Sequence, residues 1–219
     1  MSEPDWNALP PLRDVIARHG LRAEKKFGQN FLLDRNVTDK IVSCAGDCRG
    51  VTIFEIGPGP GGLTRSLLRS GAEKVVAIEF DPRAVEALQD LAIFAGDRLK
   101  IIEGDALAVD LTAMAEKPPR MIIANLPYNI ATPLLIGWLR QIHTNPRTYA
   151  QMVLMFQREV AERLAARPGS KAYGRLSVLA QWLCDVDLVY HLPPQAFTPP
   201  PKITSAVVRF RPRVLPDNL

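Results

Sequence analysis

One stretch of the chain combines an apolar strand pattern, a glycine-rich turn and the start of a helix. From residue 52 to residue 64 it reads T-I-F-E-I-G-P-G-P-G-G-L-T. The β-branched and aromatic residues before the turn are typical of a buried strand, and leucines at helical spacing follow the turn. Gly57, Gly59 and Gly62 fit the G-x-G-x-x-G pattern of a nucleotide-binding βαβ unit. Such glycines let the backbone turn sharply and approach a ligand closely.

A second apolar strand supports a nucleotide-like ligand. It runs from Lys74 to Ile78 and ends at Glu79, which lies 22 residues after Gly57. An acidic side chain at about this spacing accepts hydrogen bonds from the hydroxyls of a bound ribose. The alternative for Glu79 is a solvated charge at the end of a strand. Taken with the glycine turn, its position favours the ribose.

Strands and helices continue to alternate along the chain. Asp81 and Pro82 open a helix, since proline suits a first helical turn. Further strands are expected at 99–102, 121–124 and 152–155, with a helix at Pro133–Leu139. Two final strands, 186–190 and 203–210, are expected to pair antiparallel. The pattern predicts an α/β fold with a Rossmann-like, doubly wound, mostly parallel sheet of seven strands and a terminal antiparallel hairpin.

Composition excludes several classes of protein. The chain has 219 residues, enough for one sizeable core, and no apolar run approaches the ~20 residues that span a bilayer. Its polar, acidic start is unlike a secretory signal. Cys44, Cys48 and Cys184 have no matching histidine cluster, so we expect reduced thiols in a cytoplasmic protein and no metal. The net charge of +4 permits a nucleic-acid partner without requiring one.

The ends of the chain differ from its middle. Residues 1–25 are expected to form a mobile N-terminal arm with one short helix, residues 26–213 a catalytic domain and residues 214–219 a tail. The arm is basic around residues 13–26, and a second basic segment at 167–175 contains one tyrosine and two glycines. Each basic segment is either a solvated surface or a contact for a phosphate backbone.

The tetrapeptide Asn125-Leu126-Pro127-Tyr128 follows a predicted strand and has the groups needed to transfer a substituent to an exocyclic amino nitrogen. Such an amine, as in adenine, is a poor nucleophile because its lone pair is delocalised into the ring. The Asn125 side-chain oxygen, with a carbonyl beside Pro127, could accept the amine's N–H bonds and localise that pair. Pro127 makes the turn rigid, and Tyr128 could stack on an extruded base. The alternative is an ordinary turn with a packed tyrosine.

Two other segments carry unexplained polar residues. Asp105 lies just past a strand end, where α/β sheets bind ligands, and it could equally cap the next helix. The segment Phe27–Leu32, F-G-Q-N-F-L, reads as a loop leading to a helix that Asp34 caps. Packing does not account for the amides of Gln29 and Asn30, since buried amides need partners.

Six motifs together resemble those of one family in order and spacing. They are F-G-Q-N-F-L (27–32), E-I-G-P-G-P-G-G-L-T (55–64), E-F-D-P (79–82), E-G-D-A (103–106), N-L-P-Y-N-I (125–130) and F-T-P-P-P-K-I-T-S-A-V (197–207). The chain resembles the ribosomal RNA adenine N6-dimethyltransferases, most of all the bacterial small-subunit type linked to kasugamycin sensitivity. The resemblance covers the chain from about Lys25 to Arg211.

The resemblance implies a class I methyltransferase with S-adenosyl-L-methionine as donor and no metal. Its substrate would be the small ribosomal subunit, with 16S rRNA methylated on N6 of two adjacent adenosines near the 3′ end. The resemblance further implies a cytoplasmic protein without membrane contact, and we expect a monomer. In this family a small helical domain usually follows the segment that ends here near Arg213, and it is apparently missing from this chain.

The resemblance also implies roles for individual residues. The donor's methionine part would lie beside Gln29, Asn30 and Leu32, and the glycine turn at Gly57 and Gly59 would lie against the donor. Ribose hydroxyls would bind Glu79, and the donor's adenine amine would bind Asp105. The residues expected at the reaction centre and the target base are Asn125, Leu126, Pro127, Tyr128 and Phe156, with Phe197 as a further aromatic candidate.

Three alternative functions stay open at this point. Large-subunit rRNA adenine methyltransferases of the macrolide-resistance type share much of the pattern. A non-catalytic RNA-binding assembly or transcription factor could use the same scaffold. A dehydrogenase would fit the βαβ unit, but it would leave the Asn125–Tyr128 and Phe27–Leu32 segments without a role.

Overall fold

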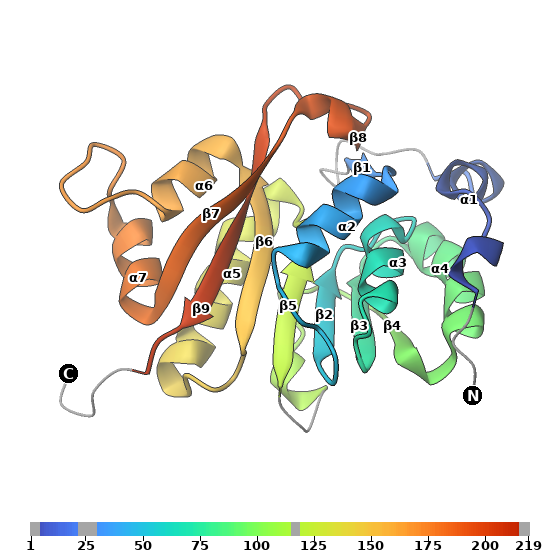
Figure 1. Ribbon diagram of the computed structural model, residues 1–219, viewed down its shortest axis with the longest axis horizontal. Helices are drawn as coiled ribbons and strands as arrows, with labels where there is room; N and C mark the ends of the chain where they lie inside the picture. Colours follow the sequence, from blue (N-terminus) through green and yellow to red (C-terminus); the bar gives the residue numbers. More distant parts are fainter. Residues whose placement is uncertain (1–4, 22–29, 115–118, 215–219) are drawn as a thin grey trace.

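A seven-stranded sheet forms the centre of the structure, a computed structural model that describes residues 5–21, 30–114 and 119–214. Figure 1 shows the strands side by side in the order β4-β3-β2-β5-β6-β9-β7. The first five of these are parallel, and β9 is antiparallel to both β6 and β7. The bounds are β2 (Thr52–Ile56), β3 (Lys74–Glu79), β4 (Leu99–Glu103), β5 (Arg120–Ala124), β6 (Gln151–Gln157), β7 (Cys184–Leu192) and β9 (Ser205–Pro212).

Helices cover both faces of this sheet because its central strands are apolar on both faces. On β2, Ile53 and Phe54 are fully buried in two separate hydrophobic clusters, one on each side. The Ile53 side packs against α2 (Arg35–Ser43), α3 (Gly62–Arg69) and α4 (Pro82–Ala95). The Phe54 side packs against α5 (Tyr128–Thr144), α6 (Arg158–Leu164) and α7 (Arg175–Leu183). The predicted doubly wound, mostly parallel sheet with a terminal antiparallel pair is confirmed.

Helix α5 is longer than its sequence pattern indicated. We expected it at Pro133–Leu139, but it begins at Tyr128 and ends at Thr144. Proline inside a helix removes a backbone donor and costs about 3 kcal/mol, which favoured a start at Pro133. Burial of Leu135, Trp138 and other residues along the helix offsets that cost. Because α5 starts at Tyr128, this residue lies at the carboxyl edge of the sheet.

A second, two-stranded sheet joins two distant segments. In it β1 (Phe31–Leu32) pairs antiparallel with β8 (Phe197–Thr198). The sequence placed Phe31 and Leu32 in a loop, and this part of the prediction is wrong because the pairing partner lies far along the chain. A Cβ at Gly62 would lie 2.1 Å from the carbonyl oxygen of Leu32, so α3 can start beside β1 only with glycine there.

The described part of the N-terminal arm packs on the domain. Helix α1 (Leu12–Arg18) confirms the predicted short helix. Val15 and Leu21 are buried with Ala84 and Ala87 of α4, and Figure 1 shows α1 beside that helix. The domain boundaries predicted at residues 25 and 213 stay predictions. The 3-10 helices are η1 (Trp6–Ala8), η3 (Gly96–Arg98), η4 (Leu111–Ala113) and η5 (Pro194–Ala196).

The predicted basic loop and the predicted terminal pair of antiparallel strands are both present in the structure. The basic segment 167–175 is a loop up to Gly174, after which α7 begins. The predicted terminal hairpin is β7 and β9, with a bulge between Leu188 and Tyr190 of β7. Within the described ranges, no helix is long and apolar enough to cross a membrane.

Candidate active site

The glycine turn between β2 and α3 forms one wall of a cavity. Gly57, Gly59 and Gly61 all have positive φ, at +65°, +55° and +89°, a region that other residues rarely adopt. A Cβ at Gly59 would lie 3.0 Å from the Phe31 ring, which also lines the cavity. The turn therefore requires glycine both for its backbone conformation and for its close approach to β1.

The cavity has a volume of about 370 Å³ and lies at the carboxyl ends of the parallel strands β2, β3, β4 and β5. This is where open α/β sheets bind ligands. The structure brings ten of the predicted site residues together here. They are Asn30, Leu32, Gly57, Gly59, Glu79, Asp105, Asn125, Leu126, Pro127 and Tyr128. Gln29 lies outside the described residues.

Glu79 ties the end of β3 to the glycine turn. Its Oε2 accepts a hydrogen bond of 3.0 Å from the backbone N–H of Gly59. Its Oε1 accepts from the N–H groups of Phe80 and Asp81, at 2.8 and 2.9 Å. Burial raises the pKa of Glu79, and these three bonds oppose the shift. The carboxylate is thus held rigidly at the cavity wall and is not a solvated strand end.

Asp105 lines the cavity from the turn after β4. Its Oδ1 accepts from the N–H of Leu107 at 2.9 Å, which closes a turn and not a helix. The alternative role as a helix N-cap is therefore wrong, since Asp110 caps the next helical segment, η4. The backbone bond from Gly104 N–H to the Glu79 carbonyl, 2.9 Å, keeps this turn beside β3.

Asn125 is oriented by the segment before β1. Its Nδ2 donates a hydrogen bond of 3.1 Å to the backbone carbonyl of Asn30. With the nitrogen used in this way, Oδ1 is the atom of the side chain that can accept a bond. Because Asn125 also lines the cavity, its amide can offer this acceptor to an amine bound there.

Tyr128 and the two phenylalanine candidates differ in position. Tyr128, the first residue of α5, lines the cavity. Phe156 does not line it: the side chain is 1% exposed and packs edge-to-face on Phe210, with ring centroids 6.3 Å apart. Phe197 is also buried, in β8. The two-ring sandwich predicted for Tyr128 and Phe156 is not assembled in this structure, because Phe156 lies within the core beneath α6.

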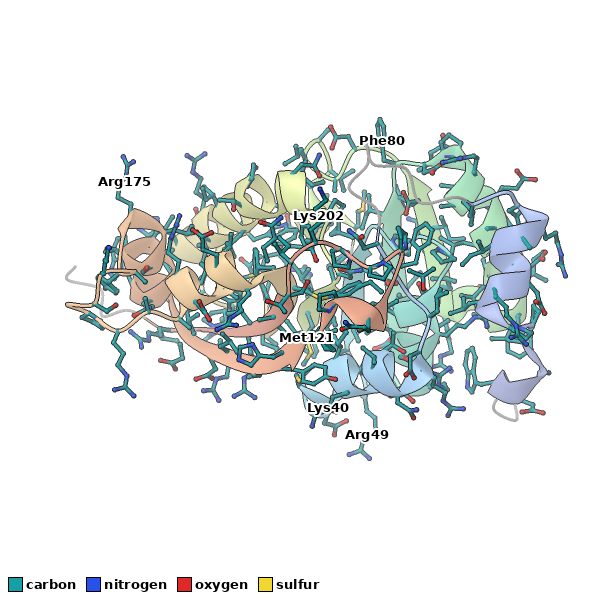
Figure 2. The ribbon with its side chains drawn as sticks, turned by 90° about the horizontal axis from the view of Figure 1, so that it is seen from above. Lys40, Arg49, Phe80, Met121, Arg175 and Lys202 are labelled. Carbon is teal, nitrogen blue, oxygen red and sulfur yellow. The ribbon has the colours of Figure 1, made fainter. Side chains whose placement is uncertain are left out.

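Several lining residues were not predicted as site residues, and three of them have unusual environments. Phe80 and Leu107 are 61% and 50% exposed although apolar, and both line the cavity. Figure 2 shows the labelled Phe80 side chain projecting from the edge of the molecule. The third is Glu55, which is 1% exposed. A carboxyl in an otherwise apolar strand was the signal in the sequence that could have identified it.

Glu55 is buried with one oxygen unpaired. Among the described residues, its Oε2 has no hydrogen-bond partner. Burial raises the pKa of Glu55 to about 8; the neighbouring Thr64 hydroxyl opposes this shift, and the charge of Glu79 adds to it. Near neutral pH the native state therefore holds a proton on Glu55 that the unfolded chain releases.

This burial predicts a pH dependence of stability. The folded pKa is about 8 and the ordinary value is 4.5, so stability falls as pH rises through that window. Glu55→Gln should remove a contribution of up to about 1.4 kcal/mol per pH unit to that slope. Urea unfolding of both proteins between these pH values measures the difference. Glu103→Gln, at the exposed end of β4, is the matched control. Equal slopes for wild type and Glu55→Gln would contradict the assignment.

No histidine of the described residues lines this cavity. Within the described ranges, no group of three or more His, Cys, Asp or Glu side chains is arranged to hold a metal ion. His19, His143 and His191 are absent from the cavity wall, and His143 instead packs against Trp182. The absence of a metal stays a prediction.

Known proteins resemble the chain over most of its length. The family described as ribosomal RNA adenine dimethylase matches residues 20–217. Ribosomal RNA small subunit methyltransferase A of Rhodospirillum rubrum is 55% identical over 215 residues, which are 98% of this chain and 73% of that protein.

Two solved structures have a similar fold. A dimethyladenosine transferase from Plasmodium falciparum gives a TM-score of 0.71 at 31% identity, over 82% of this chain and 62% of that chain. The 23S rRNA methyltransferase ErmE gives the same TM-score at 28% identity, over 85% of this chain and 71% of that chain.

Proposed function

Because this chain belongs to the ribosomal RNA adenine dimethylase family, we propose that it methylates N6 of two adjacent adenosines near the 3′ end of 16S rRNA, with S-adenosyl-L-methionine as donor. The products would be dimethyladenosines, formed during ribosome biogenesis. The observation that carries the proposal is the single cavity shared by Glu79 and Asn125. One of these residues suits a ribose and the other an exocyclic amine.

The cavity suits a nucleoside donor. Glu79 uses three of about four acceptor positions on its carboxylate for backbone N–H groups, which leaves room for a ribose hydroxyl. We assign the donor's adenine amine to Asp105 and its methionine part to Asn30 and Leu32, with Gln29 as a further contact. When bound, the donor supplies a methyl group activated on a sulfonium centre, for which acidic and carbonyl-lined walls are favourable.

The residues at the end of β5 would act on the target amine. Asn125 Oδ1 would accept one N–H bond of adenine N6, and a backbone carbonyl of the Leu126–Pro127 turn would accept the other. These bonds would localise the nitrogen lone pair and aim it along the line of transfer. Positioning of the reacting atoms can supply about 7–11 kcal/mol of the barrier reduction. Direct transfer of the methyl group from the donor's sulfonium to N6 therefore needs no protein nucleophile.

Tyr128 would stack on the flipped base. Aromatic side chains commonly hold single-stranded or extruded bases in this way, at about 1–3 kcal/mol per base. Since Phe156 and Phe197 lie within the core in this structure, the base-stacking proposal rests on Tyr128 alone.

The alternative functions have less support. A large-subunit substrate is named for ErmE, at 28% identity, whereas the small-subunit relative is 55% identical. A purely RNA-binding factor would have no use for Glu79, Asp105 and Asn125 around one cavity. A dehydrogenase would leave Asn125 without a function.

The direct test is transfer of labelled methyl groups. Small ribosomal subunits that lack the modification should incorporate label only when protein and donor are both present. Mapping should place the label at two adjacent adenosines near the 3′ end of 16S rRNA. Large subunits and already methylated small subunits are the controls. Donor binding without incorporation into small subunits, or label confined to large subunits, would contradict the proposal. The monomeric state and the cytoplasmic location stay predictions.

A further inference from the structure

A hydrogen bond links the Tyr128 hydroxyl to strand β9, which lies beyond β6 in the sheet. The Tyr128 hydroxyl and Ser205 Oγ lie 2.5 Å apart, although the residues are 77 positions apart in the sequence. Tyr128 lines the cavity, whereas Ser205 is completely buried and does not line it. The hydrogen bond to Tyr128 therefore connects the Ser205 side chain to the cavity.

Ser205 is held rigidly by its surroundings. It is the first residue of β9, which Figure 1 shows between β6 and β7. On one side it is in register with Gln157 of β6, and on the other with Leu192 of β7. The preceding carbonyl, that of Thr204, accepts a 3.0 Å bond from Arg158 N–H. The backbone pairing on both sides thus fixes the position of Ser205, and its hydroxyl can restrain the Tyr128 ring.

The Tyr128 ring is held less firmly by packing than a tyrosine in the core would be. One side of its environment is the cavity, so packing alone leaves space into which the ring could turn. A hydrogen bond at the hydroxyl constrains the far end of the ring and hence both side-chain torsions. Burial also raises the pKa of Tyr128, with the Ser205 bond opposing the shift, so the hydroxyl stays protonated near neutral pH.

We propose that Ser205 is a positioning residue, which holds the Tyr128 ring in the orientation that stacks on the target base. This inference rests on the proposed function and extends it to a residue outside the cavity. Ser205 does not touch either substrate; it acts through the tyrosine hydroxyl. Its removal should therefore impair the alignment of the base and leave donor binding intact.

A double-mutant cycle tests this assignment. Ser205→Ala and Tyr128→Phe remove the same bond from its two ends. We expect each single variant to lower the single-turnover methylation rate about tenfold, equivalent to about 1.4 kcal/mol. The double variant should be no slower than either single variant, since the bond can be lost only once. The KM for RNA should change less than the rate, because phosphate contacts dominate affinity.

A second buried serine provides the matched control. Ser177 of α7 is also completely buried, and it bonds the backbone of Gly174 and Arg163 away from the cavity. Ser177→Ala should lower the melting temperature about as much as Ser205→Ala does, but it should leave the methylation rate unchanged. Donor affinity, measured by titration calorimetry, should be the same in all variants.

Each outcome of the cycle supports or overturns the assignment. A wild-type rate in Ser205→Ala or in Tyr128→Phe overturns it, as does an additive loss in the double variant. If Ser205→Ala does not fold, the Tyr128→Phe rate alone decides. Failure of the wild-type protein to methylate small subunits would instead contradict the proposed function, before the cycle is begun.

Discussion

Replacing Asn125 with alanine should lower the rate of methyl transfer by about 10² to 10³-fold, the range for removing a pre-organised hydrogen-bonding group from an active site. The substitution deletes the Oδ1 acceptor that we assign to the target amine. It also deletes the Nδ2 donor to the Asn30 carbonyl, a 3.1 Å bond. Single-turnover kinetics with saturating donor measures the effect on the chemical step.

The fold should survive this change. A single partly buried side-chain bond contributes about 1 kcal/mol, far less than the stability of a domain of this size. Donor affinity should change little, since Glu79 and Asp105 are untouched. Asn36→Ala, on the exposed start of α2, is the matched control and should keep the wild-type rate. A rate for Asn125→Ala within about threefold of wild type would remove Asn125 from the proposed chemistry.

Replacing Glu79 with alanine should weaken donor binding by about 100-fold or more. Hydrogen bonds to a charged acceptor contribute about 1.5–3 kcal/mol each, so the loss of the ribose contact by itself accounts for much of that factor. The N–H groups of Gly59, Phe80 and Asp81 would also lose their shared acceptor, so the glycine turn would be held less firmly. Both effects act on the donor side of the cavity.

Thermal-shift titration with the donor and with its demethylated product measures this loss, since a ligand that binds only the folded protein raises its melting temperature. Wild type should show a shift that grows with ligand concentration, and Glu79→Ala should show none over the same range. Glu103→Ala is the matched control, because Glu103 pairs in register with Glu79 at the exposed end of the neighbouring strand. Equal shifts in wild type and Glu79→Ala would refute the ribose assignment.

The local pattern of the sequence was sufficient for the sheet and for one side of the cavity. The strand, the glycine turn and the helix around Gly57 are consecutive, and the spacing to Glu79 is that of one βαβ unit. The same holds for Asp81 and Pro82, which open α4 as expected. Such features depend on contacts between near neighbours, so residue type and spacing carry the information.

Contacts between distant segments could not be obtained in this way. The pairing of Leu32 with Phe197 and the bond between Tyr128 and Ser205 each join residues far apart in the chain. No periodicity encodes such a pairing. The start of α5 at Tyr128 was also missed, because the cost of Pro133 is local whereas the burial that offsets it comes from the rest of the core.

Phe156 illustrates the same limit at the site itself. An aromatic residue at the end of β6 can point to either side, and the sequence does not state which. The folded chain places it against Phe210 in the core and leaves Tyr128 at the cavity.

The sequence by itself determined the alternation of strands and helices in the main sheet, the glycine turn, the place of Glu79 at the cavity and the family. Only the tertiary structure decided which aromatic ring reaches the cavity, how Asn125 is turned by Asn30, and that Ser205 supports Tyr128. The reason is physical. Backbone propensities and side-chain periodicity act over a few residues, whereas the orientation of a side chain depends on whichever atoms the whole fold brings within a few ångströms of it.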